Sequence, residues 1–381
     1  MKPVFKTACG RLYQGDCLEI LKSWKDNNFT TVITDPPYEL GFMGKKWDSS
    51  GVAFQIETWK EVLRVCKPGA IMLAFGGTRT HHRLMCAIED AGWEIRDVMM
   101  WLYGSGFPKS LDISKAIDKA AGVKREVGPV DSSRAGRLVN QKGDYKTGVG
   151  WSAGNRKITI DPPATTEAQL WDGYGTALKP AYEPIIVAMK PLDGTFANNA
   201  LSHGVAGLNI DAGRIFREER DTSGWSLSGS KESENAAMGG KNYSRDPKPD
   251  NLKGRWPANI ILDEEAGAIL DEQGNYISQG MMHPDTGRAS RFYYCPKASK
   301  PERGESNTHP TVKPITLIEY LVGLVAPPKD AKILDPFIGS GTLGVICEEL
   351  ETKYVGIDLD CSIATNRIGE TIPSTGLFRK E

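Results

Sequence analysis

The first hundred positions alternate between short apolar runs and segments whose apolar residues recur at helical spacing. The runs are typical of strands, and the helically spaced segments predict amphipathic helices between them. One helix should end at Pro68-Gly69, because proline and glycine terminate helices. The expected strands cover 30–34, 70–77 and 94–103, with a shorter one from Arg11, and the expected helices cover 54–69 and 80–93. This alternation predicts a parallel sheet with helices on its faces.

The same alternation returns near the end of the chain. A helix is expected within 309–328, behind an entry segment that contains proline. The stretch 331–350 predicts a strand, a glycine-rich turn and a helix, and 353–360 predicts a strand that ends in acidic residues. We therefore expect one sheet assembled from both ends of the chain.

The middle of the chain has a different composition. The segments 122–159 and 216–254 are rich in glycine, serine and charged residues, which is typical of long loops inserted into a domain. Between Lys109 and Lys157 there are eleven Lys or Arg residues against five Asp or Glu residues. Either segment can be a solvated loop or a binding surface, but the local positive excess makes the first the better candidate for an element that faces DNA.

Composition, charge and cysteine usage restrict the classes of protein to which the chain can belong. The chain has 381 residues, 40% of them hydrophobic, and a formal net charge of −1, so total charge does not point to a nucleic-acid partner. Its seven cysteines are scattered, without a CxxC pair or a metal-type spacing with the histidines. We therefore expect a reduced, cytoplasmic protein without a metal site. No apolar run or leader predicts a membrane segment or secretion.

The stretch TTVITDPPYELGF, 30–42, places a strand directly before Asp35, Pro36, Pro37 and Tyr38. Each proline fixes φ and lacks an N–H, so the strand should end in a stiff loop. That loop carries one carboxylate and one aromatic ring. Taken alone, the motif favours a plain strand-terminating turn.

A second motif carries glycines at Gly339, Gly341 and Gly344, between a strand and a helix. Glycines at this junction let a ligand approach the backbone at the N-terminus of a helix. Asp358 lies at the end of the next strand, where an acid commonly receives two ribose hydroxyls. The spacing alone leaves a dinucleotide site open.

The combination of DPPY, HPTVKP and DPFIGSGT, in this order, resembles the S-adenosylmethionine-dependent DNA amino-methyltransferases. These enzymes methylate N6 of adenine or N4 of cytosine. The motif order resembles that of the circularly permuted β group, and further blocks are similar to those of phage and bacterial members. The resemblance implies an α/β, Rossmann-like methyltransferase fold with a mostly parallel sheet, one antiparallel hairpin, and helices on both faces. It also implies S-adenosylmethionine as the cofactor and double-stranded DNA as the partner. Dimers are common in the permuted group, so a homodimer is compatible with it.

Three regions follow from the resemblance. Residues 1–121 would form the catalytic half of the methyltransferase domain, and 301–381 would form the cofactor-binding half. Residues 122–300 would hold target-recognition insertions interleaved with core elements.

The chemistry expected of DPPY starts from the weak nucleophilicity of an exocyclic amine, whose lone pair is delocalised into the base. The carboxylate of Asp35 and the carbonyl of Pro36 would accept its two N–H groups and aim the lone pair at the methyl group. Pro36 and Pro37 would keep these acceptors rigid. Tyr38 would stack on the base after it leaves the helix.

The resemblance also implies the cofactor contacts. Phe337 would pack beside the cofactor, Asp358 would bind the ribose, and Asp16 would bind the adenine amino edge, while Asp360 would be a solvated acid at a helix entry. Asp335 would hold the loop. The remaining residues expected to contact the cofactor are Asp35, Thr311, Lys313, Gly339, Ser340, Gly341 and Thr342, of which Thr311 or Lys313 would reach its carboxylate.

Contacts to DNA are expected from basic and aromatic residues on loops near DPPY and before HPTVKP. The adjacent His81 and His82 suggest a metal as the alternative, but no third ligand lies nearby in the sequence. The candidates are Lys45, Lys46, Trp47, Arg79, His81, Lys109, Arg288 and Arg291.

Within the resemblance, DPPY favours adenine N6, because cytosine-N4 enzymes more often carry serine in place of Asp35. Cytosine N4 is the first alternative. An RNA or protein amine methyltransferase would be expected to carry an Asn-Pro-Pro-Tyr loop and the unpermuted order. An inactive DNA-binding remnant and an NAD-dependent dehydrogenase are the other classes left open.

Overall fold

The computed structural model of the chain describes residues 2–41, 46–104, 106, 110–126, 162–215, 254–277, 290, 293 and 312–371. For 46–47 and 273–277 it describes the backbone only. The chain divides into two compact units, one made of 1–104 with 182–381 and the other of 105–181. The boundaries expected at 121 and 300 remain predictions.

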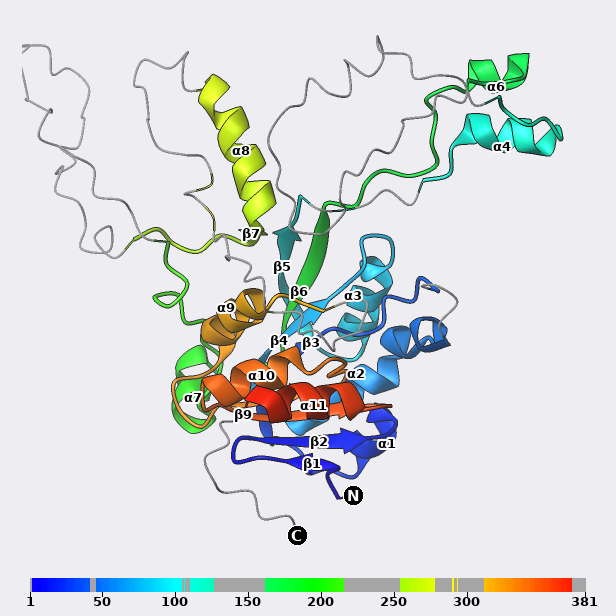
Figure 1. Ribbon diagram of the computed structural model, residues 1–381. Helices are drawn as coiled ribbons and strands as arrows, with labels where there is room; N and C mark the ends of the chain where they lie inside the picture. The colour runs from blue at the N-terminus through cyan, green and yellow to red at the C-terminus, as the bar shows by residue number, and fades with distance from the viewer. Residues whose placement is uncertain are drawn as a thin grey trace, which may run out of the picture. The chain divides into compact units, whose positions relative to one another are not determined.

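The larger unit contains one sheet with nine strands among the described residues, in the order β1-β2-β9-β8-β3-β4-β6-β5-β7 (Figure 1). Neighbouring strands are parallel except for β1 with β2, β4 with β6, and β6 with β5. The strands are β1 Phe5–Lys6, β2 Gly10–Gln14, β3 Phe29–Thr34, β4 Cys66–Phe75, β5 Glu94–Leu102, β6 Tyr182–Met189, β7 Ile260–Leu262, β8 Lys332–Asp335 and β9 Lys353–Asp358. The expected mostly parallel α/β sheet with an antiparallel hairpin is confirmed.

Strands from the two ends of the chain lie side by side in this sheet. Val32 of β3 pairs with Leu334 of β8, and Leu12 of β2 pairs with Gly356 of β9. The strand before DPPY and the strand before the glycine loop are therefore neighbours with the same direction. Both loops leave the sheet at the same edge.

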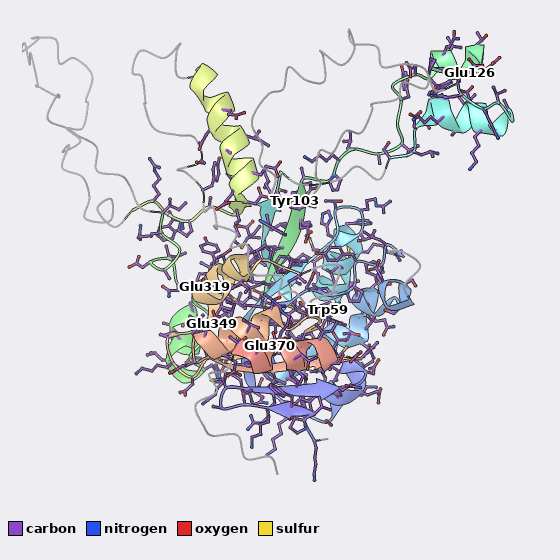
Figure 2. The ribbon with its side chains drawn as sticks, viewed as in Figure 1. Trp59, Tyr103, Glu126, Glu319, Glu349 and Glu370 are labelled. Carbon is purple, nitrogen blue, oxygen red and sulfur yellow. The ribbon has the colours of Figure 1, made fainter. Side chains whose placement is uncertain are left out.

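Helices cover both faces of the sheet. Side chains of α9, α10 and α11 pack on one face, and those of α1, α2 and α3 pack on the other. Glu319, Glu349 and Glu370 lie on exposed positions of α9, α10 and α11 (Figure 2). The helices of this unit are α1 Cys17–Lys22, α2 Ile56–Val65, α3 His81–Asp90, α7 Phe196–Ser202, α8 Glu264–Ile277, α9 Ile315–Val325, α10 Thr342–Glu349 and α11 Ser362–Thr371.

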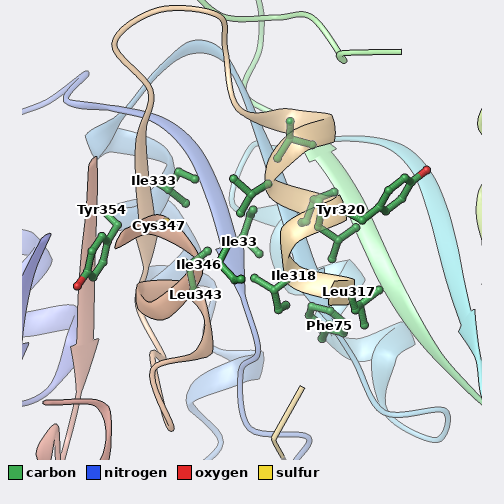
Figure 3. Packing of buried hydrophobic residues seen from close by; sticks show 14 of the residues in the cluster. Ile33, Phe75, Leu317, Ile318, Tyr320, Ile333, Leu343, Ile346, Cys347 and Tyr354 are labelled. Atoms are coloured by element: carbon green, nitrogen blue, oxygen red, sulfur yellow. The ribbon is translucent and has the colours of Figure 1, made fainter. Parts of the chain in front are cut away.

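The strand side chains alternate between these two faces, as the pleat requires. Leu73 of β4 belongs to the core under α9 and α10, whereas Met72 and Ala74 belong to the core under α2 and α3. Figure 3 shows the first core, in which Ile33 of β3 lies between side chains of α9 and α10. The strands that carry the two motifs are thus buried on both faces.

The smaller unit contains α4, Ile113–Ala120, and α6, Thr166–Leu170. Asp118 of α4 is buried and accepts hydrogen bonds from the backbone N–H groups of Ala164 and Thr165. Its carboxylate also pairs with Arg125 at 2.6 Å. These bonds tie the two helices together across a long stretch of sequence.

One helix boundary differs from the expectation. The helix expected to run to Gly69 ends at Val65, and Cys66 already begins β4. Pro68 lies within the strand rather than at a helix end, and the pairing of β3 with β4 is irregular there. Gly69 supports this bend with a φ of 78°. The segments 127–159 and 216–253 lie outside the described residues, so their expected loops are not tested. Among the described helices, none is long and apolar enough to cross a membrane.

Candidate active site

A pocket of about 790 Å³ lies where β3, β8 and β9 end. Its volume is within the range of small-molecule sites, roughly 300–1,000 Å³. The loops after these three strands supply most of its wall, together with the start of α1 and the segment 39–52. The predicted residues that line it are Asp16, Asp35, Pro36, Pro37, Tyr38, Lys313, Asp335, Phe337, Gly339, Ser340, Thr342 and Asp358.

The DPPY loop is joined to the glycine loop at its base. The hydroxyl of Thr34, the last residue of β3, donates a hydrogen bond of 2.7 Å to Oδ1 of Asp335 at the end of β8. The N–H of Phe337 donates to the same oxygen at 3.0 Å. Burial raises the pKa of Asp335 to about 7, although these two bonds oppose the shift. Asp335 thus holds the loop, as expected.

The carboxylate of Asp35 uses its two oxygens differently. Oδ2 accepts a hydrogen bond of 2.7 Å from Nζ of Lys313. Oδ1 is buried and has no hydrogen-bond partner among the described residues. Burial raises the pKa of Asp35, while the charge of Lys313 acts against this rise. The carboxylate therefore keeps one acceptor that receives no hydrogen bond from the part of the chain that the structure describes.

Lys313 is almost fully buried, and its ammonium group reaches three acceptors. These are Oδ2 of Asp35 at 2.7 Å, the hydroxyl of Tyr38 at 3.1 Å and Oε2 of Glu183 at 3.2 Å. Burial alone would lower the pKa of Lys313, but the two carboxylates raise it well above its ordinary value. The buried ammonium group is therefore paired with two carboxylates and donates hydrogen bonds to Asp35 and to Tyr38. The expected contact of Lys313 with a cofactor carboxylate remains a prediction.

Tyr38 is fixed at both ends. Its hydroxyl donates a hydrogen bond of 2.7 Å to Oε2 of Glu183, and its backbone carbonyl accepts one of 2.7 Å from the hydroxyl of Thr80. Its side chain also lies against Gly77, where a Cβ atom would come within 3.2 Å of it. Burial raises the pKa of Tyr38 well above its ordinary value, so the phenol stays protonated.

The chain after DPPY is held by Asp48, a buried acid that the sequence analysis did not single out. Its carboxylate accepts hydrogen bonds from the N–H groups of Glu39, at 3.0 Å, and Leu40, at 3.2 Å. Glu39 has a φ of 55°, which places the chain in a tight turn. Leu40 and Ser50 line the pocket on this side.

The glycine loop needs glycine at Gly339 and Gly341, whose φ angles are 51° and 80°. A Cβ atom on Gly341 would lie 2.8 Å from Cα of Ala364 in α11. The N–H of Gly339 donates a hydrogen bond of 2.9 Å to Oδ2 of Asp358. Gly344 has another role, because a Cβ atom there would meet Ile368 at 2.4 Å. The third glycine therefore allows α10 and α11 to pack closely.

The hydroxyl groups of Ser340 and Thr342 share a cationic neighbour. One guanidinium nitrogen of Arg367 donates to Oγ of Ser340 at 3.1 Å and to Oγ1 of Thr342 at 3.0 Å. The ring of Phe337 lies 6.3 Å from that of the buried Trp59. Arg367 was missed in the sequence because it is nine residues beyond β9, on α11.

Asp16 begins α1 and lines the pocket opposite the glycine loop. Its carboxylate accepts a hydrogen bond of 3.1 Å from the N–H of Glu19, so it caps the helix. Asp360 likewise accepts an N–H, that of Ser362, at 2.9 Å. Capping uses part of the acceptor capacity of each acid and leaves further lone pairs available.

Glu183 was also missed. It lies at the start of β6, which runs antiparallel to β4. Because β6 runs opposite to β3, β4 and β8, its first residues lie at the sheet edge where those strands end. This direction places Glu183 at the pocket. The acid could have been noticed as a charge before the apolar run at 184–189, but its placement required the strand direction.

The structure reaches only some of the residues expected to contact DNA. Arg79 is exposed, and His81 begins α3 with Nδ1 3.2 Å from the carbonyl of Gly77. Both follow β4 on the segment that bonds to Tyr38, at the same edge as DPPY. The described residues do not include Lys45, Lys109, Arg288, Arg291 or Thr311, nor the side chains of Lys46 and Trp47.

The pocket fits the chemistry of S-adenosylmethionine. Asp358 offers a carboxylate for hydroxyl groups at the end of β9, and the glycine loop lets a ligand approach its backbone. Apolar side chains of Phe337, Ile338 and Leu343 line the same pocket as this carboxylate and Asp35. Both the expected cofactor residues and the expected catalytic acid thus face one cavity.

Comparisons with known proteins agree with this arrangement. The model of the N6_N4_Mtase family, described as DNA methylase, matches residues 29–366. The type II methyltransferase M.HindIII of Haemophilus influenzae is 21% identical over 323 residues, covering 82% of this chain and 68% of that protein. The type II methyltransferase M.BamHI of Bacillus amyloliquefaciens is 36% identical over 81 residues, covering 20% of this chain and 19% of that protein.

Among solved structures, the cytosine-N4-specific PvuII DNA methyltransferase is similar with a TM-score of 0.44 and 16% identity. The match covers 97% of this chain and 93% of that one. The family match extends over both motifs and most of the chain between them. It confirms the expected resemblance to S-adenosylmethionine-dependent DNA methyltransferases. The chain belongs to the N6/N4 family of DNA methylases.

Proposed function

We propose that this chain is a site-specific DNA methyltransferase that transfers a methyl group from S-adenosylmethionine to N6 of adenine in duplex DNA. The observation that carries the proposal is the buried Oδ1 of Asp35, which has no hydrogen-bond partner within the described ranges and lies in the pocket that also contains Asp358 and the glycine loop. A buried acceptor without a donor costs free energy in the resting protein. A substrate N–H group that satisfies it would recover this cost.

The reaction needs little from the protein besides positioning. S-adenosylmethionine supplies an electrophilic methyl group, so no covalent intermediate on the protein is required. Asp35 would accept one N–H of the amine through Oδ1, and the carbonyl of Pro36 would accept the other. These bonds localise the lone pair on the nitrogen and direct it toward the methyl group. As the N–C bond forms, the bond between the methyl carbon and the sulfonium sulfur would break and leave a neutral thioether, and the methylated amine would give up one proton to solvent.

The base must leave the double helix to reach this site, because its exocyclic amine takes part in base pairing. Tyr38 would then stack on the extruded base. Its position supports this role, since Glu183 and Thr80 fix the residue at the hydroxyl and at the backbone. Arg79 and His81, on the adjoining segment, would contact the DNA backbone.

Adenine is preferred over cytosine on the identity of Asp35. Enzymes that act on cytosine N4 more often carry serine at this position, and this chain carries an acid. The rigid DPPY loop and the ion pair to Lys313 support a carboxylate as the acceptor.

The test is long-read sequencing of DNA from a methylation-deficient bacterium that expresses the chain. Cells with the Asp35→Ala variant and cells with an empty vector are the controls. We expect N6-methyladenine within one short sequence context, present only with the unmodified chain. This result would identify the reaction and its recognition sequence together.

Other results would change the proposal in defined ways. N4-methylcytosine in one context would overturn the assignment to adenine and keep the pocket as the site. Absence of any modified base, from purified protein that binds S-adenosylmethionine, would overturn DNA as the substrate. Equal modification with Asp35→Ala would overturn the role of the carboxylate.

A further inference from the structure

Four polar side chains from three separate parts of the chain meet beside the pocket. Asp35 and Tyr38 belong to the loop after β3, Glu183 is the second residue of β6, and Lys313 lies two residues before α9. Two of these residues, Glu183 and Lys313, have no role in the proposed chemistry. Their contacts with the other two nevertheless form one connected network.

The network contains one buried cation and two carboxylates. Burying an ammonium group is costly unless it is paired and its donors are satisfied. Lys313 meets this condition through Asp35 at 2.7 Å and Glu183 at 3.2 Å. Nζ also lies 4.9 Å from the ring centroid of Phe75. The position of the ammonium group is therefore set by partners on several sides.

The network treats the two oxygens of Asp35 unequally. Lys313 holds Oδ2, and Oδ1 has no partner among the described residues. An ammonium group with an unfilled donor would be drawn to that second oxygen. The ion pair with Glu183 and the hydrogen bond to the hydroxyl of Tyr38 hold the ammonium group away from Oδ1, which keeps that oxygen open.

Glu183 also acts on Tyr38. Oε2 accepts the phenolic hydrogen at 2.7 Å and the ammonium group of Lys313 at 3.2 Å. One carboxylate oxygen thus fixes both the aromatic ring and the cation that orients Asp35. A change at Glu183 should be transmitted to both parts of the DPPY motif.

We propose that Glu183 and Lys313 are positioning residues for methyl transfer: they hold Asp35 by Oδ2 and Tyr38 by its hydroxyl, and so reserve Oδ1 for the target amine. This inference rests on the proposed function, because it takes Oδ1 as the acceptor of the substrate. Glu183 and Lys313 thereby have a function in the reaction that depends on the negative charge of one and the positive charge of the other.

Glu183→Gln preserves the shape of the side chain and removes its charge. We expect kcat to fall about 10- to 100-fold, since a charge-assisted bond that orients the reacting group is lost. Lys313→Met should lower kcat further, about 100- to 1,000-fold. The dissociation constant of S-adenosylmethionine should change by less than about threefold in Glu183→Gln, because Glu183 has no expected contact with the cofactor. The matched control is Glu94→Gln on the neighbouring strand β5, whose exposed carboxylate pairs with Arg96.

The pH dependence distinguishes positioning from a general structural defect. The charged and titratable groups around Asp35 are Lys313, Glu183, Tyr38 and Asp335. Removing the negative charge of Glu183 should move the acidic limb of the kcat profile to lower pH. Removing the positive charge of Lys313 should move it to higher pH. We expect each displacement to be at least about half a pH unit.

A double-mutant cycle tests the network without reference to catalysis. Each single substitution should raise the equilibrium constant for unfolding by a measurable factor. In the double variant Lys313→Met, Glu183→Gln, we expect the combined factor to be at least about tenfold smaller than the product of the two single factors. Additive effects would overturn the proposal, as would a wild-type kcat and an unmoved pH profile in Glu183→Gln. Coupling in a chain that methylates no DNA would overturn the proposed function and leave the network intact.

Discussion

Nζ of Lys313 lies 2.7 Å from Oδ2 of Asp35, although 278 positions separate the two residues in the chain. The lysine belongs to HPTVKP, and the aspartate belongs to DPPY. Their ion pair opposes the protonation of Asp35 that burial favours. The charge state of the proposed amine acceptor is thus determined by both ends of the chain.

The first prediction concerns Asp35 itself. Asp35→Ala removes the acceptor for the amine and should lower the rate of methyl transfer about 10²- to 10⁴-fold. Binding of S-adenosylmethionine should remain within a few-fold of the unmodified chain, because the glycine loop and Asp358 are untouched. Transfer of a labelled methyl group and calorimetric titration would measure the two effects. Asp90→Ala, an exposed change on α3, is the control, and a near-normal rate in Asp35→Ala would refute the mechanism.

Two nearby acids should differ in their effect on the cofactor. Asp358→Asn is expected to weaken binding of S-adenosylmethionine about 10-fold or more, since hydrogen bonds to a charged acceptor contribute about 1.5–3 kcal/mol. Asp360→Asn should leave binding unchanged, because asparagine also caps a helix. Equilibrium titration of both variants gives the comparison. Equal losses in the two would contradict the assignment of the ribose contact to Asp358.

The glycine loop predicts a difference in stability between two glycine substitutions. Gly341→Ala places a Cβ atom 2.8 Å from Cα of Ala364 at a φ of 80°, and should lower the free energy of unfolding by about 1–3 kcal/mol. Gly369→Ala on α11 meets no atom within 4 Å and should be neutral or slightly stabilising. Chemical denaturation measures both. A neutral Gly341→Ala would show that the loop can shift.

The raised pKa of Asp335 predicts how stability depends on pH. The folded chain holds a proton with a pKa of about 7, whereas an unfolded aspartate loses it near pH 4. Between these values the folded state binds more protons, so its free energy of unfolding falls as pH rises. Asp335→Asn lacks this titration and keeps an acceptor for Thr34 and Phe337. Its stability relative to the unmodified chain should therefore increase from pH 5 to pH 8.

Thermal unfolding at several pH values would check this prediction. Asp90→Asn serves as the control, because an exposed acid should give a difference that does not change with pH. A constant difference for Asp335→Asn as well would show that the carboxyl group is ionised in the folded chain throughout this range.

Much of the sheet could be predicted because its strands are buried on both faces. A run such as 30–34 is typical of a central strand of a sheet. The error at Cys66 arose where Pro68 and Gly69 bend a strand that the sequence presents as a helix terminus. Local rules could not show that β3 would pair with this irregular segment.

Residues of the site could be predicted where one short sequence motif determines both the type of residue and its place in the fold. Asp35, Tyr38, Asp358 and the glycine loop meet at one pocket as expected. Glu183 and Arg367 were not found, because each reaches the site through packing between distant elements. Lys313 was found, but its contacts with Asp35 and Glu183 depend on where α9 lies over β3 and β6. Such contacts are set by tertiary structure and leave no local signature.

The parallel pairing of β3 with β8 also bears on how the enzyme is made. A ribosome releases β3 early in synthesis, but its neighbour β8 begins only at position 332, and Asp358 at the end of β9 follows later still. A nascent or prematurely terminated chain that stops before these positions has DPPY without the loop beside it. Translation must therefore pass position 358 before the pocket can form.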